Sequence, residues 1–131
     1  MLLQLTDLSD EPLHSQLSRQ VRAKILAGDL EDGESLPSIR GLARQARVSV
    51  ITVQRAYEDL EREGLIVARR GKGFFVRAMG EEAKGQLARE RFSDALRPVV
   101  LEGRAEGLDD RTMSTIFNAV LDPDSSDGEK S

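Results

Sequence analysis

The chain has 131 residues, enough for one small domain with an appended region. It contains no cysteine, which excludes disulfides, thiolate metal ligands and a cysteine nucleophile. No apolar stretch approaches the roughly 18 residues that would cross a bilayer, and the first residues lack the basic region and cleavage site of a signal peptide, so we expect a cytoplasmic protein that makes no membrane contact.

The net charge of −4 is distributed unevenly along the chain. Residues 1–11 carry three acidic residues and no basic one, residues 12–77 carry twelve basic and eight acidic residues, and residues 78–131 carry seven basic and twelve acidic residues. A basic module joined to an acidic one suits a phosphate-bearing partner. Charged residues that only solvate a surface would give the same composition, so charge alone does not separate the two interpretations.

Residues 1–11 form an N-terminal extension, and a helix is predicted to follow from Pro12. Gly28 suits the end of this helix because glycine readily adopts the left-handed conformation found there. Four apolar residues recur every four positions and predict one buried stripe: Leu13, Leu17, Val21 and Ile25.

Two further helices are predicted between Pro37 and Gly64. Ser38 and Ser49 are placed to cap their amino ends, and Gly64 fits the end of the second helix. The apolar side of the first helix consists of Ile39, Leu42, Ala43 and Ala46. The buried side of the second is lined by Ile51 or Val53, together with Ala56, Tyr57 and Leu60.

Residues 65–68 and 74–76 have the composition of strands, and the basic, glycine-rich stretch between them predicts a hairpin tip. Three helices followed by a hairpin, all within residues 12–77, is the order of a winged helix-turn-helix. The predicted fold class is therefore mainly α with a small β-hairpin, in which a winged helix-turn-helix precedes a short two-helix dimerisation region.

Residues 78–121 predict that two-helix region. Apolar residues follow a helical period over about twenty residues, although Pro98 should kink or split this helix because proline lacks an N–H group. Gly107 and Asp109 suit the end of one helix and the start of the next. The acidic tail at 122–131 is expected to be disordered.

The second helix of a helix-turn-helix enters the major groove of double-stranded DNA with its amino-terminal residues facing the bases. Glutamine can pair with adenine, serine and threonine can bond several bases, and Val50 can touch a thymine methyl group. In the supporting helix, Arg40 can reach a base or a phosphate. The candidate DNA-binding residues of the two helices are Ser38, Arg40, Arg44, Ser49, Val50, Thr52, Gln54 and Arg55.

The hairpin tip is a second candidate contact with DNA. Arg70 and Lys72 can straddle phosphates or place a cation in the minor groove. Gly71 permits positive φ and the close approach of another backbone. The alternative interpretation is a tight solvated hairpin whose charges have no partner.

Four segments, read in order, resemble the DNA-binding domain of GntR-family transcription regulators: LPSIRGLA at 36–43, VSVITVQRAY at 48–57, LEREGLI at 60–66 and RGKGFFV at 70–76. The resemblance covers about 65 residues, half of the chain. It implies DNA contact by Arg40, Ser49, Thr52, Gln54, Arg70 and Gly71. This chain departs from the family at Val50, where many members have an arginine that reads a base, and at Gly41, which replaces a glutamate.

The region after the hairpin is too short for a large ligand-binding or aminotransferase-like domain, and its two helices resemble the YtrA-type subfamily. That resemblance implies dimerisation rather than effector binding, and often the repression of transporter genes. We expect a homodimer on a palindromic operator; the alternative is that both helices fold back onto their own winged domain. The expected interface residues are Leu96, Val99, Val100, Ile116, Phe117 and Val120.

Three other classes of protein are alternatives to a DNA-binding regulator. An enzyme would need a nucleophile–base or metal set, and the only histidine, His14, is better explained by packing, so we expect no catalytic residue, metal or cofactor. A ligand-gated sensor would place polar residues inside the last two apolar stripes, and few are present; its effector would be unknown. A non-DNA interaction module with the same fold is the third class.

Overall fold

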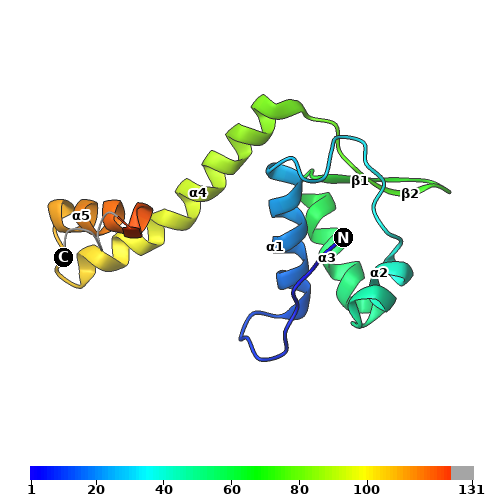
Figure 1. Cartoon of the computed structure of the whole chain (residues 1–131), viewed down its shortest axis with the longest axis horizontal. Coiled ribbons are helices and arrows are strands. Elements are labelled where there is room, and N and C mark those ends of the chain that lie inside the picture. Colours follow the sequence, from blue (N-terminus) through cyan, green and yellow to red (C-terminus); the bar gives the residue numbers. More distant parts are fainter. Residues whose placement is uncertain (125–131) are drawn as a thin grey trace. The chain divides into compact units, whose positions relative to one another are not determined.

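The computed structural model describes residues 1–124, and these residues form a helical protein with one two-stranded antiparallel sheet (Figure 1). The elements are α1 Leu13–Leu26, α2 Ile39–Ala46, α3 Val50–Arg62, β1 Ile66–Arg69, β2 Gly73–Val76, α4 Gly80–Ala105 and α5 Asp110–Leu121. The predicted fold class, mainly α with a small hairpin, is confirmed. The chain divides into a first unit, Met1–Ala88, and a second unit that begins at Arg89.

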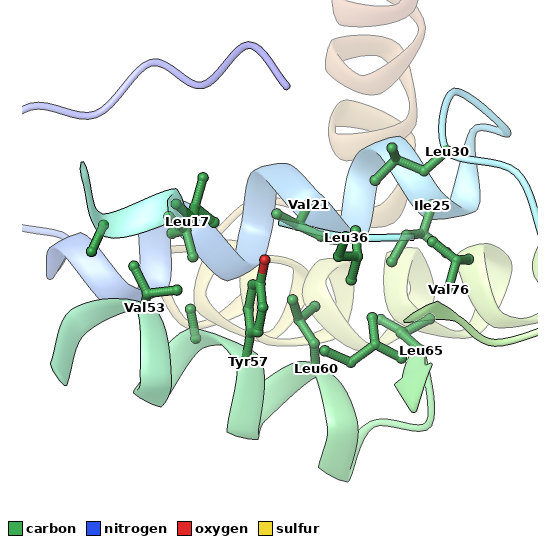
Figure 2. Packing of buried hydrophobic residues seen from close by; sticks show 14 residues of the cluster. Leu17, Val21, Ile25, Leu30, Leu36, Val53, Tyr57, Leu60, Leu65 and Val76 are labelled. Atoms are coloured by element: carbon green, nitrogen blue, oxygen red, sulfur yellow. The ribbon is translucent and has the colours of Figure 1, made fainter. Parts of the chain in front are cut away.

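The core of the first unit lies between α1 and α3, and β1 and β2 close one end of it (Figure 2). The predicted stripe of α1 is buried at Leu17, Val21 and Ile25. Burying each such side chain contributes about 1.5–3 kcal/mol relative to leaving it in water. The buried side of α3 consists of Val53, Ala56, Tyr57 and Leu60, so of the two residues offered by the sequence it is Val53 that faces the core.

Tyr57 connects α3 to both neighbouring segments. Its hydroxyl donates a 2.7 Å hydrogen bond to the carbonyl of Pro37, in the loop before α2. Its ring meets the ring of Phe74 edge to face, with centroids 4.9 Å apart. Burial raises the pKa of Tyr57 well above its ordinary value, so the hydroxyl stays protonated and keeps donating. One residue therefore fixes α2 and the hairpin against α3.

The predicted helix ends have the expected local geometry. The Ser38 hydroxyl accepts the Gly41 N–H at 3.0 Å, and the Ser49 hydroxyl accepts the Thr52 N–H at 3.1 Å. Each cap satisfies a backbone donor that has no partner inside its helix. Gly64, directly after the C-cap of α3, has a φ of 77°, which only glycine adopts without strain.

The hairpin pairs Ile66 with Val76 at its base and Arg69 with Gly73 at its tip. The loop before α2 joins it, because the Leu36 N–H donates to the Phe74 carbonyl at 2.9 Å. This third segment explains why so short a hairpin keeps a defined direction relative to the helices.

The N-terminal extension lies along α1, an arrangement that the sequence analysis did not predict. Gln16 is buried; its amide accepts the Thr6 N–H at 3.0 Å and donates to the carbonyls of Thr6 and Glu11, each at 2.8 Å. One turn later, the Gln20 amide makes the same pair of bonds with the backbone of Gln4. The two glutamines hold the extension to the helix.

The start of α4 is fixed to the first unit by Asp32, in the loop after α1. One carboxylate oxygen accepts the N–H groups of Met79 and Gly80, and the other lies 2.7 Å from the Nζ of the buried Lys84. Leu87 packs against the core of the same unit. These contacts place the division between the two units inside α4 rather than at the end of the hairpin.

The helix α4 is continuous through Pro98, so of the two predicted effects of this proline, a kink or a split, the split is wrong. Proline removes only one intrahelical bond, and α4 has 26 residues, which is long enough to absorb that loss. After Gly107, the Asp109 carboxylate accepts the Thr112 N–H at 2.8 Å and caps α5 as predicted. That bond holds the pKa of Asp109 below its ordinary value.

In the second unit, α5 folds back along the end of α4 (Figure 1). Gly103 is buried, and a Cβ on it would lie 3.1 Å from the Sδ of Met113, so glycine permits the close approach of the two helices. Of the predicted disordered tail, residues 125–131 lie outside the described part of the chain.

Candidate nucleic-acid interface

The first turn of α3 faces away from the core. Ser49 and Val50 are exposed, and Thr52 is half-buried. The Ser49 and Thr52 hydroxyl oxygens lie 2.8 Å apart, so the cap and its neighbour support each other. Gln54, one turn further, donates to the Glu58 carboxylate at 3.2 Å. This turn presents hydroxyl, amide and apolar groups together.

Cationic side chains surround this turn. Arg40 lies in the first turn of α2 and Arg44 in its last turn, and both are exposed. Arg47 is the C-cap of α2, with a left-handed φ of 57°, and it stands directly before Ser49. Arg55 is exposed on α3. An exposed helix amino end surrounded by cations attracts anions.

The hairpin tip adds further positive charge. Arg70, Gly71 and Lys72 are all exposed, and Gly71 has a φ of 74°. Arg69 lies over the ring of Phe75, 4.9 Å from its centroid, so it braces the hairpin instead of extending from it. In Figure 1 the tip and the α2–α3 turn lie on the same side of the first unit, away from α1.

Some acidic groups of this unit pair with cations away from the first turn of α3. At the other end of α3, Glu63 forms a 2.6 Å ion pair with Arg22, and Asp59 pairs with Arg62. Within residues 1–124, by contrast, the cations around the first turn of α3 and at the hairpin tip have no ion pair or hydrogen bond: Arg40, Arg44, Arg47, Arg55, Arg70 and Lys72. Exposed cations without an ion pair therefore lie both around the first turn of α3 and at the hairpin tip.

The predicted site residues differ in their surroundings. Ser38 is exposed, but its hydroxyl is already occupied as the cap of α2.

Ile51 is not among the predicted DNA-binding residues, because its position in the helical period also suits the core. The structure leaves Ile51 62% exposed beside Val50, which is 45% exposed. One sequence signal could have found Ile51. Residues 51 and 53 are both apolar, and because they lie on different sides of a helix, one of the two has to face outward.

His14 takes no part in this surface. Its Nδ1 is buried without a hydrogen-bond partner and lies 3.7 Å from an Asp59 carboxylate oxygen, on the side where α1 meets α3. Among residues 1–124 no cluster of three metal-ligating side chains occurs. None of the helices in that range is long and apolar enough to span a membrane.

The second unit presents an apolar surface. In the described chain, Val99, Ile116 and Val120 are 62%, 49% and 71% exposed. Leu96, Val100 and Phe117 are half-buried. All six predicted interface residues therefore keep accessible apolar area. Only Gly103 is buried among the described residues from 89 to 124, so the helices of one chain enclose no ligand-sized core there.

Residues 13–76 match the family described as bacterial regulatory proteins, gntR family. The HTH-type transcriptional repressor YtrA of Bacillus subtilis (strain 168) is 30% identical over 111 residues, which cover 82% of this chain and 83% of YtrA. The chain belongs to the GntR family. YhcF, an uncharacterized HTH-type transcriptional regulator of the same organism, is 36% identical over 85 residues, 63% of this chain and 70% of YhcF. This GntR-family protein is thus a transcription regulator of the helix-turn-helix type, and its similarity to YtrA extends beyond the hairpin, which confirms the predicted subfamily.

Solved structures share the fold of this GntR-family chain. A GntR family transcriptional regulator from Listeria monocytogenes superposes with a TM-score of 0.72 over 84% of this chain and 96% of its own, at 24% identity. The DNA-binding domain of AraR, solved in complex with operator ORX1, covers 56% of this chain and 92% of its own, at 29% identity and a TM-score of 0.50.

Proposed function

We propose that the protein is a sequence-specific DNA-binding repressor that acts as a homodimer on a palindromic operator. The observation that carries this proposal is the set of unpaired cations around the exposed first turn of α3 and at the hairpin tip. Duplex DNA offers a line of phosphates on either side of a groove wide enough for a helix. The operator complex of the similar AraR domain supports the same partner.

In this proposal, α3 enters the major groove with its amino end toward the bases. Gln54 and Thr52 read base edges, and Arg40 reaches a base or a phosphate. Arg44 and Arg55 bind phosphates and hold the register. Arg70 and Lys72 extend from the hairpin to the backbone or into the minor groove, where the exposed Gly71 permits a close approach. Ser38 and Ser49 cap their helices and can also bond phosphate oxygens.

The apolar surface of the second unit supports the homodimer. The two helices are too small to bury their stripes in one chain, and a second copy would cover the exposed valines and isoleucine. A two-fold pair of winged domains reads two half-sites one helical turn or more apart. Occupied promoter DNA then excludes polymerase, which is repression. Similarity to YtrA is the basis for proposing repression and, through the subfamily resemblance, transporter genes as targets.

Selection of bound duplexes from a random pool, with the full chain as bait, tests the proposal and defines the operator. Arg40→Ala should weaken binding to that operator roughly tenfold in fluorescence anisotropy, and Arg70→Ala should lower the salt slope by about 1 because one phosphate contact is lost. Arg19→Ala is the matched control, since Arg19 is exposed on α1 and pairs with Glu11. Equal affinities for the Arg40 variant and the control would remove Arg40 from the interface, and no enriched sequence would refute specific binding.

A further inference from the structure

Two adjacent apolar side chains in the first turn of α3, Val50 and Ile51, are left accessible to solvent. Successive residues of a helix are rotated by 100°, so Ile51 lies almost opposite the buried stripe formed by Val53, Ala56, Tyr57 and Leu60. With 62% of Ile51 and 45% of Val50 exposed, neither contributes fully to the core. β-Branched residues are also weaker helix formers than alanine. Folding of a single chain therefore gives no reason for this pair at the first turn.

The surroundings of the pair indicate what covers it. The exposed guanidinium groups of Arg47 and Arg55 come shortly before and after it, and neither has an ion pair within residues 1–124. The cap hydroxyl of Ser49 directly precedes it. An apolar centre with an unpaired cationic rim is complementary to a partner with an apolar centre and an anionic rim. The major groove of A·T-containing DNA has this character, because thymine methyl groups project between two rows of phosphates.

We propose that Ile51, together with Val50, is a specificity-determining contact that packs on thymine methyl groups, so that each operator half-site carries A·T pairs beneath the first turn of α3. This inference rests on the proposed function and deepens it by naming the base chemistry that the site selects. The resemblance to the GntR family implies an arginine at position 50 in many members, and arginine would select guanine. The apolar pair selects thymine instead.

The test removes single methyl groups from the DNA. In the operator selected from the random pool, each thymine of one half-site is replaced in turn by deoxyuridine, which lacks only the C5 methyl group. Binding of the wild-type chain should weaken about fourfold at one or two positions, the effect of losing burial of one methyl-sized group. In Ile51→Ala the effect should almost vanish at the thymine that Ile51 contacts, because that contact is already lost, whereas a thymine contacted by Val50 should keep its response.

Leu8→Ala is the matched control, because Leu8 is an apolar residue with 96% exposure on the N-terminal extension. It should retain the wild-type response to deoxyuridine. Ile51→Ala removes no buried group, and circular dichroism checks that it folds; if it does not, the deoxyuridine series on the wild-type chain still decides. Tight binding with no methyl sensitivity, or a half-site without thymine, overturns this inference and leaves DNA binding standing. Absence of any operator binding overturns the proposed function as well.

Discussion

At the scale of single residues, amide, hydroxyl and carboxylate side chains satisfy backbone groups that would otherwise lack partners. Ser38, Ser49 and Asp109 do this within one turn of their own helices. Gln16 does it across ten residues, between α1 and the extension. The first kind was predictable because the partner is always two or three residues away. The second kind depends on where another segment passes, which no local pattern specifies.

Gln16→Ala should destabilise the first unit by about 1–3 kcal/mol, because it removes three hydrogen bonds of a buried amide and leaves the partly buried backbone groups of Thr6 and Glu11 without these partners. Urea unfolding measures this free energy, and hydrogen exchange should show faster exchange at the Thr6 amide. Gln45→Ala, at an exposed position on α2, is the control and should leave stability within about 0.5 kcal/mol of the wild type. Equal stabilities of the two variants would contradict the structural role given to Gln16.

At the scale of elements, the loop residue Asp32 replaces a conventional cap at the start of α4. Its carboxylate accepts two backbone N–H groups and pairs with Lys84, and the hydrogen bond from Lys84 is the main cause that holds the pKa of Asp32 below its ordinary value. A group whose pKa is lowered on folding stabilises the fold above its unfolded pKa. That contribution is lost as the pH falls through the folded pKa.

Asp32→Asn tests this arrangement, because asparagine can still accept the two N–H groups but leaves the Lys84 cation without its counter-charge. The variant should melt at a lower temperature than the wild type at pH 7. The difference in melting temperature should narrow as the pH falls below 3.8, the ordinary aspartate value, and close once the pH passes below the lowered pKa of the folded state, where the wild-type carboxylate is protonated too. A difference in melting temperature that stays constant from pH 7 to pH 3 would show that the charge of Asp32 does not anchor α4.

At the scale of the whole molecule, the chain combines a unit with its own core and a helical unit with uncovered apolar faces. The first can be stable alone, whereas the second lacks a buried core in the described residues. The proposed homodimer accounts for this difference, since the second copy would bury what one chain exposes.

Replacing Ile116 and Val120 together by aspartate should convert the proposed dimer into a monomer, because charges would be buried at the interface without partners. Light scattering at micromolar concentration should give half the mass of the wild-type particle, and affinity for a palindrome should fall to that for one half-site. Thr115→Asp, on the opposite side of α5, should remain dimeric. A wild-type chain with the mass of one chain, or a dimeric double variant, would refute this interface.

The sequence by itself determined the winged helix-turn-helix, its caps, the hairpin and the family. These features follow from periodicity, turn chemistry and short motifs, which act between residues close in the chain. Only the tertiary structure decided that Val53 rather than Ile51 faces the core, that Gln16 holds the extension, that Asp32 anchors α4, and that α4 continues through Pro98. The first three depend on which segments distant in the sequence pack together, because a side chain's burial and its partners are properties of that packing and not of its neighbours along the chain.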